Sequence, residues 1–299
     1  MGVSRRGLLI GAAGTAGVLV LGAAGGYELV EHDVLPGRLR LNAMLGEDPP
    51  PPDVPQVRPG PMVNGTFASA QRNGIDVAWT VAYPPGYDAD AHLPVTVALH
   101  GRGGDHTWPF GGLSLQYYLA DAVLNHGVAP FAIASVDGGD ATNWHPRADG
   151  DNPQGMVVKE FVPLLRDRGL ATQRLGLWGW SLGGYGALLL ATVLGPRRVA
   201  AVVASSPALW PTAAETAPDV FDDAADYDRN NVYTRIGRLK GIPLRIDVGD
   251  NDSFQHNDEE FRAMLSPTPA GGVSHGFHDA SYWMRVAPAE IAFLGQHLG

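Results

Sequence analysis

Cysteine is absent from the 299-residue sequence. Its absence excludes thiol nucleophiles, thiolate metal ligands and disulfide bonds, so the redox compartment cannot be inferred from cysteine usage. Charged residues are also scarce, at 17% of the chain, whereas glycine and proline number 39 and 24. This composition excludes a coiled coil and favours many turns between short elements.

Long basic runs are missing as well. The net charge is −10, and no run of basic residues exceeds two, as at Arg197–Arg198. The chain therefore lacks the positive surface that neutralises phosphates, and we expect no nucleic-acid partner. What is present, 45% hydrophobic and 8% aromatic residues, is ordinary for a protein with a sizeable packed core.

The N-terminal residues 1–26 have the composition of a targeting segment. Arg5 and Arg6 precede an apolar, Gly/Ala-rich stretch that runs to about Gly26, and no acidic residue occurs before Glu28. The start "SRRGLL" resembles a twin-arginine export signal, which predicts an extracellular or cell-envelope location. The alternative is an uncleaved anchor that associates with the membrane, since about 20 apolar residues can span a bilayer.

Residues 27–61 are expected to form a tether. This segment ends in the proline-dense run "GEDPPPPDVPQVRPGP", which should be extended and should pack poorly. Residues 62–299 have the length of a single domain and show no internal repeat.

Within residues 62–299, apolar runs of strand length alternate with helix-length amphipathic segments. Strand patterns include "LPVTVALHG", "APFAIASVDGG", "RLGLWGW" and "IPLRIDVGD", and helix patterns include "LSLQYYLADAVLNHG", "GGYGALLLATVLG" and "APAEIAFLGQHL". The alternation predicts an α/β fold with a mostly parallel sheet covered by helices on both faces. Functional groups should then gather in the loops beyond the carboxyl ends of the strands.

One of these loops contains the pentapeptide "GWSLG", Gly179 to Gly183. It lies between a predicted strand and a predicted helix, which is the context in which a G-x-S-x-G motif presents a nucleophilic serine. The glycines permit a turn that is too tight for a Cβ, and the helix N-terminus favours a developing negative charge. Ser181 is therefore the candidate nucleophile.

A serine hydroxyl needs a histidine base and an acid that orients the base. Both residue types follow in the chain, each with two candidates. Asp250 and Asp252 come after the strand pattern "IPLRIDV", and His275 and His278 precede the last helix. The residue types alone leave the choice within each pair open.

The motifs "GWSLGGYGAL", "VGDNDSF" and "GFHDASYW" together resemble the putative-esterase branch of the α/β-hydrolases, which is similar to esterase D and to the mycobacterial mycolyltransferases. The resemblance implies an α/β-hydrolase fold, with Asp252 as the acid and His278 as the base. Asp250 is then expected to be a solvent-exposed carboxylate in a turn, without a catalytic role. His275 then lines the pocket or lies in solvent, and His256 faces water or the mouth of the site.

The fourth motif, "ALHGRGGD", matches the family pattern H-G-x-G-G at His100 to Gly104. In this superfamily one oxyanion N–H comes from the residue after the nucleophile and the other from a loop after an early strand. The expected donors are therefore the backbone amides of Leu182 and Arg102. His100 is expected to shape the loop rather than act as a base.

The predicted substrate contacts are Trp144, His145 and Trp180. The first two lie in an unusually polar loop, Thr142 to Met156, for which a salt-bridged structural role is the equal alternative. No metal site is expected, because the acids in this loop do not have EF-hand spacing. The acidic region from Trp210 to Val232 is expected to form a small cap insertion.

Together these features predict an exported serine esterase that acts through an acyl-enzyme, needs no cofactor and takes a small-molecule or lipid ester as substrate. One alternative is an envelope acyltransferase, although the mycolyltransferases use Glu where this chain has Asp252. Another is a hydrolase-fold protein that only binds envelope lipids or glycans. A cytoplasmic S-formylglutathione hydrolase is disfavoured, because the signal would send the protein away from glutathione.

Overall fold

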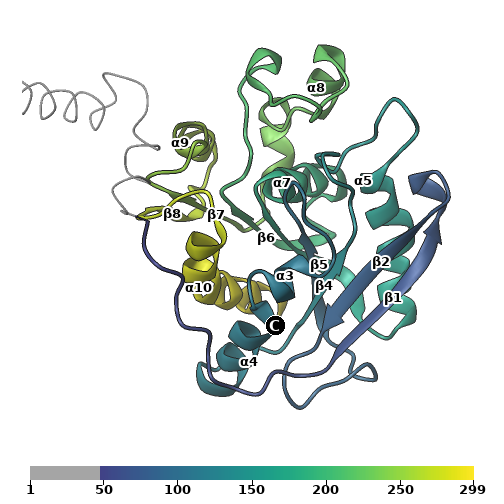
Figure 1. The fold of residues 1–299 in the computed structure, drawn as a ribbon, viewed down its shortest axis with the longest axis vertical. Helices are drawn as coiled ribbons and strands as arrows, with labels where there is room; N and C mark the ends of the chain where they lie inside the picture. The colour runs from purple at the N-terminus through teal and green to yellow at the C-terminus, as the bar shows by residue number, and fades with distance from the viewer. Residues whose placement is uncertain (1–47) are drawn as a thin grey trace, which may run out of the picture. The chain divides into compact units, whose positions relative to one another are not determined.

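One mixed sheet forms the centre of residues 48–299, the part of the chain that the computed structural model describes (Figure 1). Its strand order is β1-β2-β4-β3-β5-β6-β7-β8. The pairs β1–β2 and β2–β4 are antiparallel, and all other neighbours are parallel. The strands are β1 (Met62–Ser69), β2 (Ile75–Ala82), β3 (Pro94–Leu99), β4 (Ala132–Val136), β5 (Ala171–Trp180), β6 (Val199–Ser205), β7 (Leu244–Gly249) and β8 (Ala270–Ser274).

Burial along the strands explains their positions in the sheet. Every residue of β4 and β6 is buried, as expected for central strands that are covered on both faces. In contrast, β1 lies at an edge, and its residues alternate between exposed and half-buried up to Ser69. The predicted α/β class with a mostly parallel sheet is therefore confirmed.

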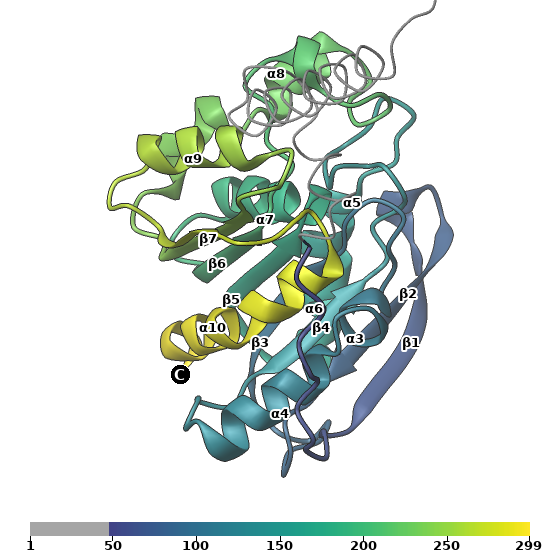
Figure 2. The same cartoon turned by 60° about the vertical axis from the view of Figure 1, so that its left-hand side comes forward.

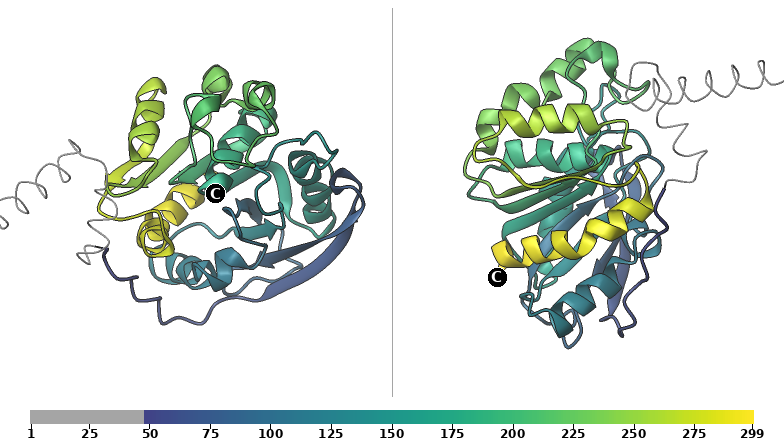
Figure 3. Two further views of the ribbon diagram at one scale, coloured as in Figure 1. Left: turned by 45° about the horizontal axis from the view of Figure 1, so that its top comes forward. Right: turned by 90° about the vertical axis from the view of Figure 1, so that its left-hand side faces the viewer.

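Helices cover both faces of the sheet (Figure 2). On one face, α7 (Leu182–Leu194) packs beside a continuous helical segment made of α5 (Pro153–Met156), a π-helical turn (Val157–Phe161) and α6 (Val162–Asp167). On the other face, α4 (Leu115–Asn125) and α10 (Ala280–Leu298) lie side by side (Figure 3), with the short α3 (Trp108–Gly111) nearby. Each face thus has its own apolar core.

A cap insertion lies between β6 and β7, as predicted. It contains a 3₁₀ turn (Ala213–Glu215), α8 (Ala224–Asn230) and a second 3₁₀ segment (Tyr233–Leu239). The cap has a small core of its own, in which Val220 and Tyr227 pack with Leu182, Ala208 and Trp210. In Figure 1, α8 lies at the top of the view, above α7.

Among the elements that the sequence patterns did not predict are β1, β8 and α9 (Gln255–Met264). β8 has the sequence "AGGVS" and is mostly exposed, so it lacks a hydrophobic signal, and α9 is dominated by polar residues. Sheet pairing with β7 and packing through Phe261 stabilise these two elements. Such contacts depend on tertiary structure, and local patterning does not reveal them.

The predicted signal, residues 1–26, and the first part of the tether, up to residue 47, lie outside the described residues. Residues 49–61 have no regular secondary structure and belong to the same compact unit as the sheet. Val54 packs against the core beside α4 and α10, and the Pro49 carbonyl accepts a hydrogen bond from Arg285. None of the helices in residues 48–299 has the length and hydropathy that crossing a bilayer requires.

Candidate active site

Ser181 lies at the sharp turn between β5 and α7. Its backbone has φ 54° and ψ −120°, in a region that residues other than glycine seldom adopt. The turn is held by hydrogen bonds from Ser181 N–H to the Ser205 carbonyl (3.1 Å) and from the Ala208 and Tyr185 amides to the Ser181 carbonyl (3.0 and 3.1 Å). The serine side chain is thereby presented beyond the carboxyl end of the sheet.

The two glycines of the motif are required by close backbone contacts. A Cβ on Gly179 would lie 2.0 Å from the carbonyl oxygen of Gly183, and a Cβ on Gly183 would lie 1.9 Å from that of Leu99. Both distances are far inside van der Waals contact. The glycines thus allow α7 to start directly against β3 and β5, as the motif predicts.

Three side chains from separate loops meet at this turn. His278 Nε2 lies 2.9 Å from Ser181 Oγ, and His278 Nδ1 lies 2.8 Å from Asp252 Oδ2. Asp252 is fully buried at its side chain, and its Oδ1 accepts a hydrogen bond from the Phe254 amide at 2.8 Å. The arrangement joins an acid, an imidazole and a hydroxyl in one hydrogen-bonded chain, the geometry of a serine nucleophile with its base.

The rival histidine and acid pair with each other elsewhere. His275 Nδ1 lies 3.1 Å from both carboxylate oxygens of Asp250, and both side chains are about half exposed. His256 is on α9 with its side chain 81% exposed. The structure therefore brings Asp252 and His278, and not Asp250 and His275, to Ser181.

Asp279 explains part of the motif "GFHDASYW". Its carboxylate accepts a hydrogen bond from the Tyr282 amide at 2.9 Å and caps the N-terminus of α10. Gly276, with φ 156°, leaves no space for a side chain, because a Cβ would lie 2.4 Å from the Tyr282 ring. These two residues fix the short loop that carries His278.

The predicted oxyanion donors, Arg102 and Leu182, both line the pocket at Ser181. Gly101 packs against the nucleophile, since a Cβ there would lie 3.3 Å from Ser181 Cβ, and the Gly104 amide closes a turn onto the Gly101 carbonyl (3.2 Å). Within residues 48–299, the amides of Arg102 and Leu182 donate no backbone hydrogen bond. Both N–H groups are thus available to an oxygen bound beside the serine.

His100 stabilises the loop that carries Arg102. Its Nδ1 donates to the Gly101 carbonyl (2.8 Å), and its Nε2 accepts from the Gly138 amide (2.9 Å). Burial lowers the pKa of His100, which favours the neutral ring that this pattern of one donor and one acceptor requires. These bonds agree with a loop-shaping role.

A pocket of about 320 Å³ opens at Ser181. Four of the side chains that line it are large and aromatic, and Arg102 lines it as well. Sequence reasoning missed the aromatic wall, although Phe254 and Trp283 lie within the motifs that identified the triad. The lining residues are Gly101, Arg102, Gly104, Trp108, Ser181, Leu182, Ala208, Trp210, Ala217, Phe254, His278 and Trp283.

The three predicted substrate contacts require correction, because each is buried and none lines the pocket. Trp144 fills the space beside Gly138 and Gly186 and donates from Nε1 to the His100 carbonyl (3.1 Å). Trp180 is fully buried and packs against Trp108 and Trp178 on the α10 face of the sheet.

His145 is also fully buried. Its Nε2 lies 2.8 Å from Asp226 of α8, and its ring stacks on Phe221. Burial lowers the pKa of His145, although the Asp226 charge opposes this shift. The polar loop from Thr142 to Met156 therefore has the structural role that was the alternative to a pocket wall.

A buried carboxyl pair lies behind the site. Glu290 of α10 accepts hydrogen bonds from Ser205 Oγ and from Trp178 Nε1 (3.0 Å), and the carboxyl group of Asp247 in β7 lies close enough to interact with it electrostatically. Arg245 pairs with Asp247 at 2.6 and 2.9 Å. Burial, and then the Asp247 charge, raises the pKa of Glu290 well above its ordinary value, and burial also raises that of Asp247. The pair therefore retains a proton at pH values where exposed carboxyls have lost theirs.

The raised pKa of Glu290 predicts a pH-dependent stability. Between its ordinary and raised pKa values, the folded state binds more protons than the unfolded state, so stability falls as pH rises. Glu290→Gln should weaken this dependence, so that the stability of the variant relative to wild type rises as the pH is raised from about 5 to about 9. Thermal unfolding of wild type and variant at several pH values in this range measures the difference in stability. Glu259→Gln is the control, because Glu259 is exposed. If the stability of wild type and that of Glu290→Gln depend on pH in the same way, the carboxyl pair does not retain the proton inferred here.

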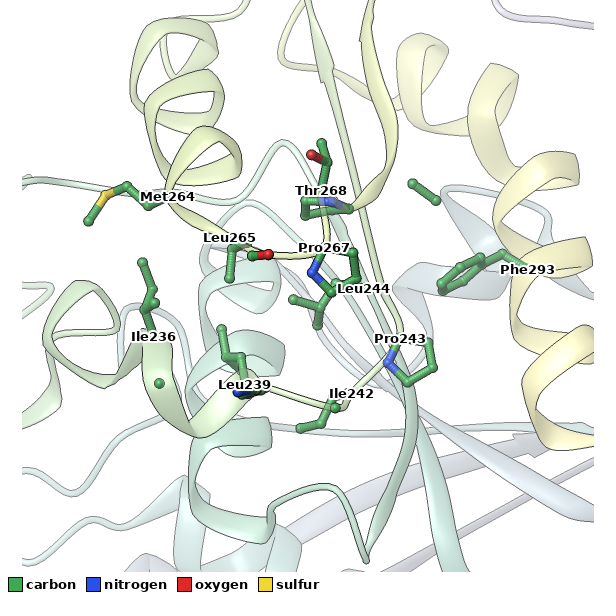
Figure 4. A pocket seen from close by; sticks show the side chains of 16 residues that line it. Ile236, Leu239, Ile242, Pro243, Leu244, Met264, Leu265, Pro267, Thr268 and Phe293 are labelled. Atoms are coloured by element: carbon green, nitrogen blue, oxygen red, sulfur yellow. The ribbon is translucent and has the colours of Figure 1, made fainter.

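A second cavity, of about 440 Å³, lies at the opposite end of β7 and β8 (Figure 4). Its wall is mostly apolar and includes Leu239, Ile242, Leu244, Leu265 and Phe293, with Lys240 as the single ionisable residue among those that line it. No His, Asp or Glu is among the residues that line it. Among residues 48–299, no three His, Asp or Glu side chains are grouped to hold a metal ion.

A mostly parallel sheet with a strained serine between a central strand and its helix, facing a histidine and a buried aspartate, defines the α/β-hydrolase class. A family model described as "Putative esterase" matches residues 71–273. The chain belongs to this family and is an ester hydrolase of the serine hydrolase type.

Solved structures with the same fold include esterases and related hydrolases of low sequence identity. A ferulic acid esterase has a TM-score of 0.69 and 18% identity over 79% of this chain and 98% of its own. FphF, a fluorophosphonate-binding serine hydrolase of Staphylococcus aureus, has a TM-score of 0.67 and 19% identity over 80% of this chain and 99% of its own. An S-formylglutathione hydrolase from Agrobacterium tumefaciens has a TM-score of 0.67 and 16% identity over 80% of this chain and 95% of its own. A search of curated proteins finds no match.

Proposed function

We propose that this protein is an exported serine esterase that hydrolyses small carboxylic esters through an acyl-enzyme. The observation that supports this most directly is the bridging position of His278, 2.9 Å from Ser181 Oγ and 2.8 Å from Asp252 Oδ2. One imidazole can accept the serine proton only if its other nitrogen is held by an acceptor, and both conditions are met here.

The proposed reaction has two halves. Ser181 Oγ attacks the ester carbonyl while its proton moves to His278, and the amides of Arg102 and Leu182 stabilise the oxyanion. The C–O bond to the alcohol breaks, the alcohol leaves with the proton from His278, and the acyl group stays on Ser181. Water then attacks the acyl-enzyme with His278 as base, which releases the acid and restores the serine.

The pocket restricts the substrate class. About 320 Å³ lined by Trp108, Trp210, Phe254 and Trp283 suits a small apolar or aromatic group attached to the ester. The solved relatives are named as acting on ferulic acid esters and S-formylglutathione. For this chain we propose small-molecule esters with short or medium acyl groups. Lipid esters would have to extend out of the pocket.

The place of action follows from the N-terminal sequence alone. Arg5 and Arg6 before an apolar segment support export to the cell envelope or beyond. Whether the N-terminus also associates with a membrane stays a prediction, because residues 1–47 lie outside the described part.

A panel of p-nitrophenyl esters, from acetyl to dodecanoyl, tests the function with the full-length chain. We expect turnover of acetyl to about octanoyl esters and covalent labelling by a fluorophosphonate probe. A second series with glycerol or trehalose present separates hydrolysis from acyl transfer, since a transferase would form a new ester in place of the free acid. If no ester is turned over and the probe does not label the protein, the esterase proposal is wrong and a binding role replaces it.

A further inference from the structure

Two arginines hold one turn of the cap from outside it. The carbonyls of Pro218, Asp219 and Val220 are consecutive, and each accepts a hydrogen bond from a guanidinium. Arg102 Nη2 donates to the Pro218 carbonyl at 3.2 Å, and Arg147 Nη1 donates to those of Asp219 and Val220 at 3.0 Å each. Arg147 comes from the polar loop after β4, so the cap is tied to a different part of the fold.

Arg147 also forms an ion pair with Asp222. Its Nε and Nη2 lie 2.9 and 2.8 Å from Asp222 Oδ1, and the Ala148 amide donates to Asp222 Oδ2 at 2.6 Å. The Arg147 and Asp222 side chains are only 16% and 23% exposed. A partly shielded fork of this kind is stronger and more directional than an ordinary surface pair.

The loop that carries Arg147 is anchored to the body of the domain. The Arg147 amide donates to the Asp151 carbonyl at 2.7 Å, and the Asp151 carboxylate pairs with the buried Arg72 (Nη2 to Oδ2, 3.0 Å). The guanidinium of Arg72 also donates to the Asp137 carbonyl just beyond β4, at 3.0 Å. Arg147 therefore links the cap, through Asp151 and Arg72, to the end of β4.

The turn held by Arg147 adjoins the wall of the active-site pocket. Ala217 lines that pocket directly. Phe221 packs edge-to-face against Trp210, which also lines the pocket, with 6.5 Å between ring centroids. A shift of the turn would move both wall residues.

Val220 and Phe221 are held by packing, since Val220 is buried in the cap core and Phe221 contacts four aromatic or imidazole rings, but the two residues before them lie at the surface. Pro218 and Asp219 are exposed, and Asp219 has φ 67°, a left-handed conformation that costs about 1 kcal/mol for a residue with a Cβ. Without the arginine contacts the turn could relax out of this conformation.

We propose that Arg147 is a positioning residue that sets the upper size limit of the acyl group by holding the Pro218–Asp222 turn against the pocket. This inference rests on the proposed esterase function. Arg147 does not line the pocket at Ser181, so it acts on substrate choice through Ala217 and Trp210.

The test compares wild type, Arg147→Ala and Arg147→Lys on the acetyl-to-dodecanoyl ester panel. We expect Arg147→Ala to raise the dodecanoyl-to-acetyl ratio of kcat/KM roughly tenfold, mainly through KM, while kcat for acetyl ester stays within about threefold. Arg147→Lys should be intermediate, because an ammonium keeps the charge but lacks the planar fork. Arg166→Ala is the matched control, since Arg166 pairs with Asp167 in an exposed position on α6.

Amide hydrogen exchange of residues 213–223 adds a readout that does not need substrate, and it should be faster in Arg147→Ala than in wild type and Arg166→Ala. An unchanged chain-length ratio, equal losses on short and long esters, or unchanged exchange in Arg147→Ala would each overturn the proposal. If wild type turns over esters and only these results fail, the esterase function stands. If wild type is inert on the whole panel, both proposals fall together.

Discussion

Ser181→Ala is expected to lower kcat/KM for p-nitrophenyl acetate by at least about a thousandfold, because the proposed acyl-enzyme can no longer form. Ser181 Oγ is the hydroxyl within 2.9 Å of His278 Nε2, and a methyl group in its place has no nucleophilic oxygen. The backbone amides of Arg102 and Leu182, the proposed oxyanion donors, are unchanged in this variant, so a small rate above that of water should persist. Initial rates at several ester concentrations measure the loss, and fluorophosphonate labelling should disappear with it.

The chain offers a matched control for this result in its second histidine–aspartate pair. His278→Ala should lose activity to a similar extent as Ser181→Ala, whereas His275→Ala should keep it within about threefold, because His275 pairs with Asp250 and not with Ser181. Combining Ser181→Ala with His278→Ala should add little, since the two residues act as one unit. Equal losses for His275→Ala and His278→Ala would contradict the assignment of the base.

Gly183→Ala is expected to unfold at a temperature lower by about 10 °C or more, or to give no folded protein. The added Cβ would lie 1.9 Å from the Leu99 carbonyl oxygen and 2.6 Å from that of His100. Both partners are backbone atoms of β3 and the loop that follows it, so no side chain can rotate away and α7 would have to separate from the sheet. Thermal unfolding followed by circular dichroism measures the loss.

Gly237→Ala serves as the control for this prediction. Gly237 lies in the 3₁₀ segment Tyr233–Leu239, and a Cβ there would meet no atom within 4 Å. Its unfolding temperature should stay within about 2 °C of wild type. If both glycine variants unfold at the same temperature, the close contact between α7 and β3 is not what requires glycine at position 183.

The catalytic motif could be recognised from the sequence because its chemistry is local. The elbow needs a strand, two glycines, a serine and a helix within one short stretch, and "LGLWGWSLGGYGALLLA" has all of them in order. The choice between His275 and His278 was different. The two residues are three positions apart, and the resemblance to a family, rather than any physical property of the segment, indicated His278.

The pocket wall and the polar loop could not be predicted in the same way. Trp144 and His145 lie in a stretch rich in polar residues, which is typical of a surface. Both are nevertheless buried, because Gly138, Gly186 and Asp226 lie against them. Conversely, Trp108 and Trp210 carried no signal of a role at the site. Which aromatic residue faces the substrate depends on the packing of elements that are far apart in the sequence.

The sequence by itself determined the alternating strands and helices, the serine elbow and the order of acid and base, because these depend on periodicity, glycine sterics and spacing within short segments. Only the tertiary structure decided which side chains surround the serine, that Asp252 and His278 meet it, and that Arg147 holds the cap. Those outcomes depend on the meeting of loops from β3, β4, β5, β7 and β8 at one edge of the sheet. The distances between such loops are set by the packing of the whole core and are not encoded in any one of them.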